Sequence, residues 1–211
     1  MYGSLLTIVS DMPRWSVAHQ EPLVRWEWEL MNEHTNTPNQ ASSGCNGLAG
    51  DSSASEADAG LTPAVILDAL EATIVSLERL LEGRSSEELR QAAQDGGWGI
   101  VEILSHIQDW EEVAHERVRS ILEQTRPELE DYDDSLWAIE HDYGSQNGHT
   151  VLACIVELRS QLVERLRHLE PASWQRQAIL AGEGEITLRW LMQRLVEHDA
   201  RHIGQAREVF G

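Results

Sequence analysis

Beyond residue 60 the chain places its apolar residues at helical spacing in four separate stretches, and this pattern constrains the fold more than any other feature. The stretches cover residues 63–83, 98–124, 149–169 and 187–209. Each repeats its apolar positions every three or four residues, which gives a helix one apolar stripe along its length. Four amphipathic helices bury such stripes by packing together, so the sequence predicts an all-α four-helix bundle. Residues 178–186 are the one segment in which a short hairpin fits.

The second and third predicted helices are joined by a long connection, residues 125–148, which holds the acidic run Glu128–Asp134 and Trp137. A connection of this length in a compact domain is commonly functional or contains short helices of its own. It also allows a crossover topology, in which consecutive helices are not simple up-and-down neighbours. We interpret the acidic run itself as a solvated loop.

The first 60 residues differ from the rest in composition. Residues 36–60 are small and polar, with one leucine and no aromatic side chain, so they cannot bury enough apolar surface to offset the entropy cost of ordering. We interpret them as a disordered linker. Residues 22–34 fit a short amphipathic helix, interpreted as an appendage, with docking on the domain or a partner as the alternative. The predicted organisation is an N-terminal extension, residues 1–60, and a helical bundle domain, residues 61–211.

Composition excludes several classes of function. The formal net charge of -20 argues against nucleic acids and anionic membranes as partners, because both bind clustered cations. All 16 basic residues are arginine, so no lysine is present for Schiff-base chemistry. No stretch approaches the length of a membrane span, and the apolar run Leu5–Val9 is too short for a signal peptide. The 2 cysteines form no CxxC pair and no disulfide framework, so we expect a protein of the reducing cytoplasm.

Three histidines fall on the apolar stripes, where a globular protein normally places leucine, isoleucine or valine. His106 lies on the second predicted helix, and His198 and His202 lie one turn apart on the same face of the fourth. Two imidazoles at this spacing, with a third from a facing helix, can hold one metal ion and leave a coordination position open. Inward-facing imidazoles that bind no ion need hydrogen bonds from one another or from buried water instead. Both interpretations are compatible with the spacing alone.

Other polar residues near the three histidines are weaker candidates for a role in the site. Gln205 shares the inward stripe and is the best placed to orient an imidazole. Glu102, Asp109 and Asp199 lie within a turn of a histidine, where each is also a candidate to orient an imidazole, but we interpret them as surface carboxylates. The chain has no GxSxG elbow, P-loop or GxGxxG motif, so no other catalytic arrangement competes with the histidines.

Several motifs in a fixed order resemble the DinB-like superfamily, in the branch whose members carry a histidine triad. The second predicted helix has Trp98 followed by Glu102–Asp109 (EILSHIQD). The fourth has Glu197–Gln205 (EHDARHIGQ), introduced by GEITL. The segments YDDSLW in the long connection and LEPASW after the third helix also match. The resemblance covers residues 61–211.

The resemblance implies a bundle in which His106, His198 and His202 bind a divalent metal ion, commonly zinc or nickel. Family members often form homodimers. Their assigned activities are metal-dependent hydrolysis and S-transfer with a low-molecular-weight thiol, so the resemblance implies a small-molecule substrate without naming it. For the thiol branch we expect a polar, partly cationic entrance, although we interpret Arg117 and Arg201, the nearest arginines in the sequence, as surface residues.

Three functional hypotheses stay open at this point. The first is a metal-dependent enzyme, in which water or a thiol takes the open position of the ion. The second is a non-enzymatic metal-binding or interaction module with a structural or vestigial site, which a completed fourth protein ligand would favour over catalysis. In the third, the histidines only hydrogen-bond one another or buried water, and stability is indifferent to chelators.

Overall fold

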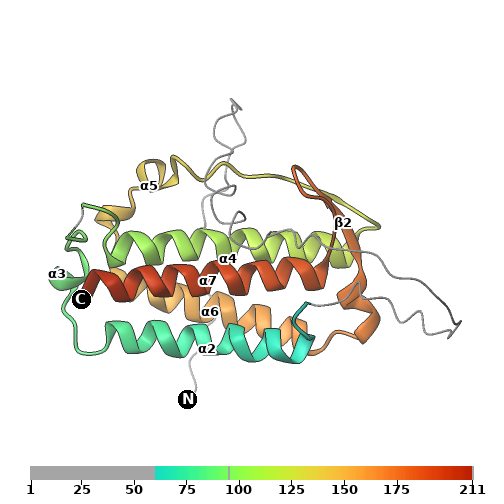
Figure 1. Cartoon of the computed structure of the whole chain (residues 1–211), viewed down its shortest axis with the longest axis horizontal. Coiled ribbons are helices and arrows are strands. Elements are labelled where there is room, and N and C mark those ends of the chain that lie inside the picture. Colours follow the sequence, from blue (N-terminus) through green and yellow to red (C-terminus); the bar gives the residue numbers. More distant parts are fainter. Residues whose placement is uncertain (1–59, 95, 211) are drawn as a thin grey trace, which may run out of the picture. The chain divides into compact units, whose positions relative to one another are not determined.

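The computed structural model describes residues 60–94 and 96–210, so the predictions for residues 1–59 lie outside the described residues. Its long helices are α2 (Pro63–Leu81), α4 (Ile100–Glu123), α6 (Gly148–Arg167) and α7 (Leu188–Phe210). They form a four-helix bundle (Figure 1), which confirms the predicted all-α fold. No helix in this described part is long and apolar enough to cross a membrane.

Capping residues set where two of the long helices begin. Thr62 Oγ1 accepts a hydrogen bond from Val65 N at 3.4 Å, and a proline follows Thr62 at the first position of α2. Asn147 Oδ1 accepts hydrogen bonds from the backbone of His149 and Thr150, both at 3.1 Å, at the start of α6. Each cap satisfies backbone N–H groups that have no partner within the helix.

The order in which the helices pack differs from their order in the sequence. α2 and α4 each pack against both α6 and α7, so these two consecutive long helices lie on a diagonal of the bundle. α4 and α6 run in the same direction, because the connection between them returns along the length of the bundle (Figure 1). This is the crossover topology that the long connection allows.

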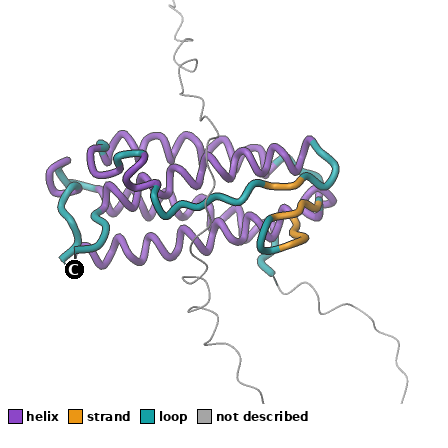
Figure 2. The backbone as a smooth tube through the Cα atoms, turned by 90° about the horizontal axis from the view of Figure 1, so that it is seen from above, coloured by secondary structure: helices purple, strands orange, loops and turns teal. Residues whose placement is uncertain are grey.

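Short elements complete the fold. The connection between α4 and α6 contains β1 (Glu128–Leu129), α5 (Trp137–Glu140) and the 3-10 turn η1 (Tyr143–Ser145). Between α6 and α7 lie the 3-10 turn η2 (Pro171–Gln175), β2 (Gln177–Leu180) and β3 (Gly184–Thr187). β2 and β3 form the antiparallel hairpin for which the sequence left room, and β1 adds to β2 in parallel (Figure 2). The interpretation of the acidic run as a solvated loop is wrong at Leu129, which is buried in the apolar core.

A close approach fixes the start of α4. A Cβ added to Gly99 would lie 2.4 Å from the carbonyl oxygen of Gln91, which follows the short helix α3 (Ser86–Leu89). Only glycine therefore fits here without a shift of the backbone. Gly99 N also donates a hydrogen bond to Glu102 Oε2 at 2.7 Å. These contacts fix the first turn of the helix that carries His106.

Two apolar clusters fill the bundle, and a buried polar layer separates them. One cluster lies beside the hairpin and includes residues from the first half of α2 and of α7. The other includes residues from the first half of α4 and the last two turns of α7. Between them each long helix contributes one buried polar side chain. The four are Thr73, Glu111, Arg159 and Asp199.

Candidate metal centre

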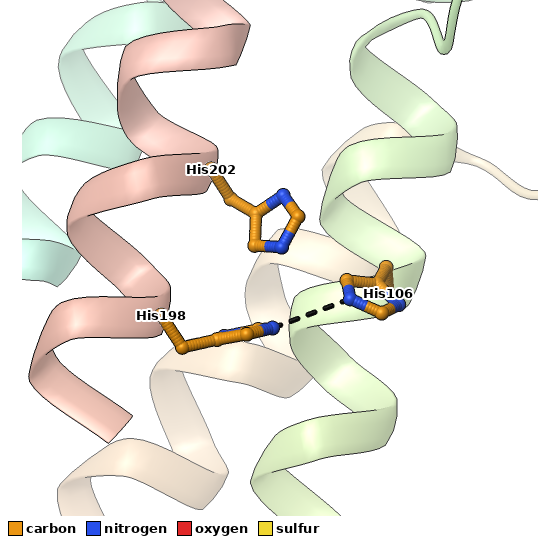
Figure 3. Close-up of side chains that lie close together, drawn as sticks. All are labelled: His106, His198 and His202. Atoms are coloured by element: carbon orange, nitrogen blue, oxygen red, sulfur yellow. Dashed lines mark hydrogen bonds between the residues drawn. The ribbon is translucent and has the colours of Figure 1, made fainter. Parts of the chain in front are cut away.

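The three predicted histidines converge between α4 and α7. His106 projects from the second turn of α4, and His198 and His202 project from successive turns of α7 (Figure 3). One ring nitrogen of each histidine lies within 4.8 Å of those of the other two. His106 Nε2 and His198 Nε2 are 3.2 Å apart. Within residues 60–94 and 96–210, no other group of His, Cys, Asp or Glu side chains offers a comparable set of metal-ligating atoms.

The rings face inward, as the helical phasing predicts. His106 and His202 are buried, and His198 is partly buried. His202 Nδ1 lies 3.0 Å from Gln205 Oε1, so the ring donates Nδ1–H to the amide oxygen and keeps Nε2 available as a ligand. Gln205 thus orients His202, the role that its place on the inward stripe predicts.

Burial sets the charge of two of the rings. It lowers the pKa of His106 to about 2, and the neighbouring basic groups His198, His202 and Arg201 act in the same direction. Burial also lowers the pKa of His202 to about 4. Both imidazoles are therefore neutral at pH 7, and a neutral imidazole is the form that binds a metal ion.

The spacing of the nitrogens fits a single ion. Tetrahedral zinc with Zn–N bonds of about 2.0–2.1 Å places two ligand nitrogens about 3.3 Å apart. The 3.2 Å between His106 Nε2 and His198 Nε2 is close to this value. The opposite nitrogens, Nδ1 of both rings, are buried without a hydrogen-bond partner among the described residues. The 3.2 Å separation also fits a hydrogen bond in which one ring carries its proton on Nε2, so this pair alone is compatible with both interpretations.

Tryptophan side chains pack around the histidines. The ring centroids of Trp98 and His106 are 5.1 Å apart, and those of Trp110 and His198 are 5.7 Å apart. Trp137 of α5 packs on Trp110 with a centroid separation of 5.6 Å. The long connection therefore reaches the site and adds an apolar wall to it, which strengthens electrostatic interactions inside.

A carboxylate from the same connection lies beside the histidines. Asp134 Oδ2 accepts a hydrogen bond from Trp110 Nε1 at 3.0 Å and lies 3.8 Å from His106 Nε2. Burial raises the pKa of Asp134, against the opposing effect of the hydrogen bond from Trp110. Sequence reasoning assigned Asp134 no role at the site because only the return of the connection along the bundle brings it there. The sequence offered one indication: Asp134 belongs to the YDDSLW segment, which is one of the segments that resemble the family.

The interpretation of Asp109 as a surface carboxylate is wrong. Its Oδ2 accepts a hydrogen bond from Tyr143 OH at 2.5 Å and lies 2.5 Å from His141 Nδ1. Both partners belong to the long connection, so Asp109 fastens that connection to α4. Glu102 has a structural role as well, because it holds the backbone of Gly99 at the start of the helix.

The two nearest arginines in the sequence have different surroundings. The interpretation of Arg117 as a surface residue is wrong: it is buried, and its Nη2 donates a hydrogen bond to Glu130 O at 2.7 Å. Its guanidinium carbon lies 5.6 Å from the ring centroid of Trp110. Arg201 is exposed, as expected.

The interpretation of Asp199 as a surface carboxylate is also wrong, because its side chain is only 1% exposed. Asp199 Oδ2 lies 2.7 Å from Arg159 Nη1 and accepts a hydrogen bond from Thr73 Oγ1 at 3.1 Å. Arg159 Nη2 also donates to Glu111 Oε1. Burial by itself favours a raised pKa for Asp199, but the Arg159 guanidinium outweighs it and holds that pKa below its usual value. At Glu111 burial prevails and raises the pKa.

Comparison with known proteins identifies a matching family and two similar proteins. The sequence model of the DinB superfamily matches residues 69–206. YfiT of Bacillus subtilis (strain 168), named "Putative metal-dependent hydrolase", is 24% identical over 144 residues, which cover 68% of this chain and 81% of YfiT. OB0782 of Oceanobacillus iheyensis, which bears the same name, is 26% identical over 119 residues, covering 54% of this chain and 69% of OB0782.

A solved structure supports the same fold. The structure of Bacillus subtilis YfiT matches with a TM-score of 0.65, covering 74% of this chain and 91% of its own, at 21% sequence identity. It is described as having an unusual four-helix bundle topology. At this identity the likeness shows the fold alone, and it confirms the four-helix bundle.

Proposed function

The chain belongs to the DinB superfamily, and from this and the three converging imidazoles we propose that it is a metal-dependent enzyme that acts on a small molecule. His106, His198 and His202 are the proposed ligands of a divalent ion, with zinc and nickel as the first candidates. One observation carries the proposal: three imidazole nitrogens from two helices lie within 4.8 Å of one another.

The donor set leaves room for chemistry. Among the described residues, the group of side chains that could hold the ion consists of the three histidines alone. Catalytic zinc sites likewise combine three protein ligands with one exchangeable position. A divalent ion held there lowers the pKa of a water or thiol ligand and so supplies a nucleophile near neutral pH. A purely structural site is expected to have a fourth protein ligand instead.

Two side chains are placed to act on whatever fills the open position. The Asp134 carboxylate, 3.8 Å from His106 Nε2, is within reach of a group beside that nitrogen and can accept a hydrogen bond from it. The hydrogen bond from Trp110 Nε1 fixes the orientation of this carboxylate. Trp110 also packs on His198, with their ring centroids 5.7 Å apart.

Within this proposal, hydrolysis is favoured over transfer of a thiol sulfur. The carboxylate of Asp134 repels a thiolate or another anion, whereas it can hydrogen-bond a neutral water. The cationic entrance expected for a thiol substrate loses one of its two candidate arginines, because Arg117 is buried and donates to a backbone carbonyl, which leaves the exposed Arg201. Both curated relatives also carry hydrolase names.

The test is an assay of the metal-loaded protein on a panel of uncharged and cationic esters and amides, with S-transfer from low-molecular-weight thiols as a second arm. We expect hydrolysis that disappears on chelation and in the His202→Ala variant. His168→Ala is the matched control, because this histidine is exposed at the end of α6, and it is expected to keep the activity. Absence of metal-dependent turnover in both arms contradicts the proposal.

The nitrogen–nitrogen contact at 3.2 Å favours a second candidate, a bundle whose imidazoles only stabilise one another. In that case zinc and chelators leave the melting temperature unchanged. Under our proposal a free ion at 1,000 times its dissociation constant stabilises the fold by about 4 kcal/mol. A binding module with a structural ion shares this stabilisation but has no turnover.

A further inference from the structure

Asp199 stands next to His198 on α7 and belongs to the buried polar layer of the bundle. Its carboxylate is fixed from one side. Oδ2 lies 2.7 Å from Arg159 Nη1 of α6 and accepts a hydrogen bond from Thr73 Oγ1 of α2 at 3.1 Å. Arg159 is held in turn, because its Nη1 donates to Leu70 O at 3.2 Å and its Nη2 donates to Glu111. The orientation of the Asp199 carboxylate is therefore determined by three other helices.

The second oxygen of this carboxylate lies near His198. Asp199 Oδ1 is buried and has no hydrogen-bond partner among the described residues, and the same holds for His198 Nδ1. These two atoms are 3.8 Å apart. A buried acceptor and a buried potential donor thus lie next to each other, and each costs free energy while it is left unpaired.

Metal binding by His198 would place a proton between these two atoms. An imidazole that offers Nε2 to an ion carries its proton on Nδ1, and this N–H then needs an acceptor. For His198 the nearby acceptor is Asp199 Oδ1. Their separation of 3.8 Å is longer than a hydrogen bond, so the bond requires the His198 ring to rotate toward Asp199 Oδ1.

We infer that Asp199 is a positioning residue, which accepts a hydrogen bond from His198 Nδ1–H, holds the ring with Nε2 toward the ion, and links the metal centre to the Arg159 layer. This inference rests on the proposed function, because it requires the ion. A carboxylate acceptor also makes the opposite nitrogen a better ligand. His202 has the neutral amide of Gln205 as its acceptor instead, so the two histidines of α7 differ in the charge of the group that accepts their Nδ1 proton.

The experiment compares the zinc affinity of Asp199→Asn with that of the wild type by competition with a chromophoric chelator. We expect the affinity to fall about 10- to 100-fold. Glu111→Gln is the matched control: it makes the same carboxylate-to-amide change in the same buried layer but does not touch a histidine. We expect its affinity to stay within about 3-fold of the wild type, although both variants lose stability.

Spectra of the cobalt(II)-loaded proteins provide a readout that a merely structural role would not move. We expect altered visible absorption in Asp199→Asn and a wild-type spectrum in Glu111→Gln. Equal affinities and spectra for wild type and Asp199→Asn overturn the inference and leave the proposed function intact, as does an equal loss of affinity in both variants. A wild-type protein that binds neither zinc nor nickel overturns the proposed function itself.

If Asp199→Asn does not fold, nitrogen-15 NMR of the zinc-loaded wild-type protein tests the inference, because it reports which ring nitrogen of His198 carries the proton. We expect a slowly exchanging Nδ1 proton on His198, as on His202 with its Gln205 acceptor. A proton on Nε2 of His198, or an Nδ1 proton that exchanges freely with solvent, overturns the inference.

Discussion

At the scale of single residues, burial decides the charge of several histidines in this fold. Burial lowers the pKa values of His106, His202 and His115. The folded chain therefore binds protons at these rings more weakly than the unfolded chain does. By linkage, these neutral rings make their full contribution to the free energy of unfolding above about pH 6.5, the pKa of histidine in the unfolded chain. This contribution is lost as the pH falls below that value.

His115 allows this effect to be measured away from the metal centre, because its Nε2 lies 2.8 Å from Leu158 O of α6. We expect His115→Gln, which keeps an N–H donor for that carbonyl, to lose less stability between pH 7 and pH 5 than the wild type loses. The measurement is the free energy of unfolding from urea titrations in the presence of a chelator. Each protein's value at pH 8 serves as its own reference. Parallel pH profiles for the two proteins contradict this account.

Residues near the site differ in how far the sequence could predict them. Gln205 was predictable, because it lies on the same inward stripe as His202 within one turn. Asp199 was a candidate only by its place beside His198. Its burial was not predictable, because a carboxylate on an amphipathic helix is normally solvated and this one is paired with Arg159 from another helix. Asp134 was not predictable for the same kind of reason, since its position depends on the path of the whole connection.

At the scale of elements, three attachments carry the long connection to the metal centre. β1 pairs with β2 at the hairpin, where the return begins. α5 places Trp137 on Trp110. Tyr143 of η1 donates to Asp109 of α4. The wall of the site is therefore built by a segment with little regular structure of its own.

The start of α4 offers a test of how an element positions a ligand. We expect Gly99→Ala to destabilise the protein by about 1–3 kcal/mol, because its methyl group would lie 2.4 Å from the backbone oxygen of Gln91. Gly144→Ala is the control, since a Cβ there has no described atom within 4 Å. The free energy of unfolding from urea titrations measures both. A Gly99→Ala protein as stable as Gly144→Ala contradicts the close packing at this helix start.

The sequence predicted elements best where their pattern is local. The four long helices follow from the apolar period and from caps such as Thr62. β1 was missed because it has only two residues within an acidic run, and its pairing with β2 is a contact between distant segments. The diagonal placement of α2 and α4 likewise depends on which faces meet in space, which the period of one helix does not encode.

At the scale of the whole molecule, the buried polar layer joins the four long helices. Arg159 contacts α2 through Leu70 O, α4 through Glu111 and α7 through Asp199. Two carboxylates share this one guanidinium in the interior, so its removal leaves buried negative charge without compensation. The homodimer that the family resemblance implies stays a prediction at this scale.

Replacement of the shared guanidinium tests this layer. We expect Arg159→Met to lower the free energy of unfolding by about 3–5 kcal/mol, because the methionine fills similar volume but cannot pair with Glu111 and Asp199. Arg165→Met, on an exposed position of the same helix, is the control and is expected to change stability by less than about 0.5 kcal/mol. Similar stabilities for the two variants would show that the layer contributes little.

The proposed metal centre requires that His106, His198 and His202 hold a divalent ion. Elemental analysis of the untagged protein after exposure to zinc and removal of loosely bound ions tests it most directly, with the His106→Ala variant measured beside it. We predict about one divalent ion per wild-type chain and a near-complete loss of the ion in the variant. A wild-type chain without stoichiometric metal, or a variant that keeps the wild-type metal content, would show that these histidines hold no ion.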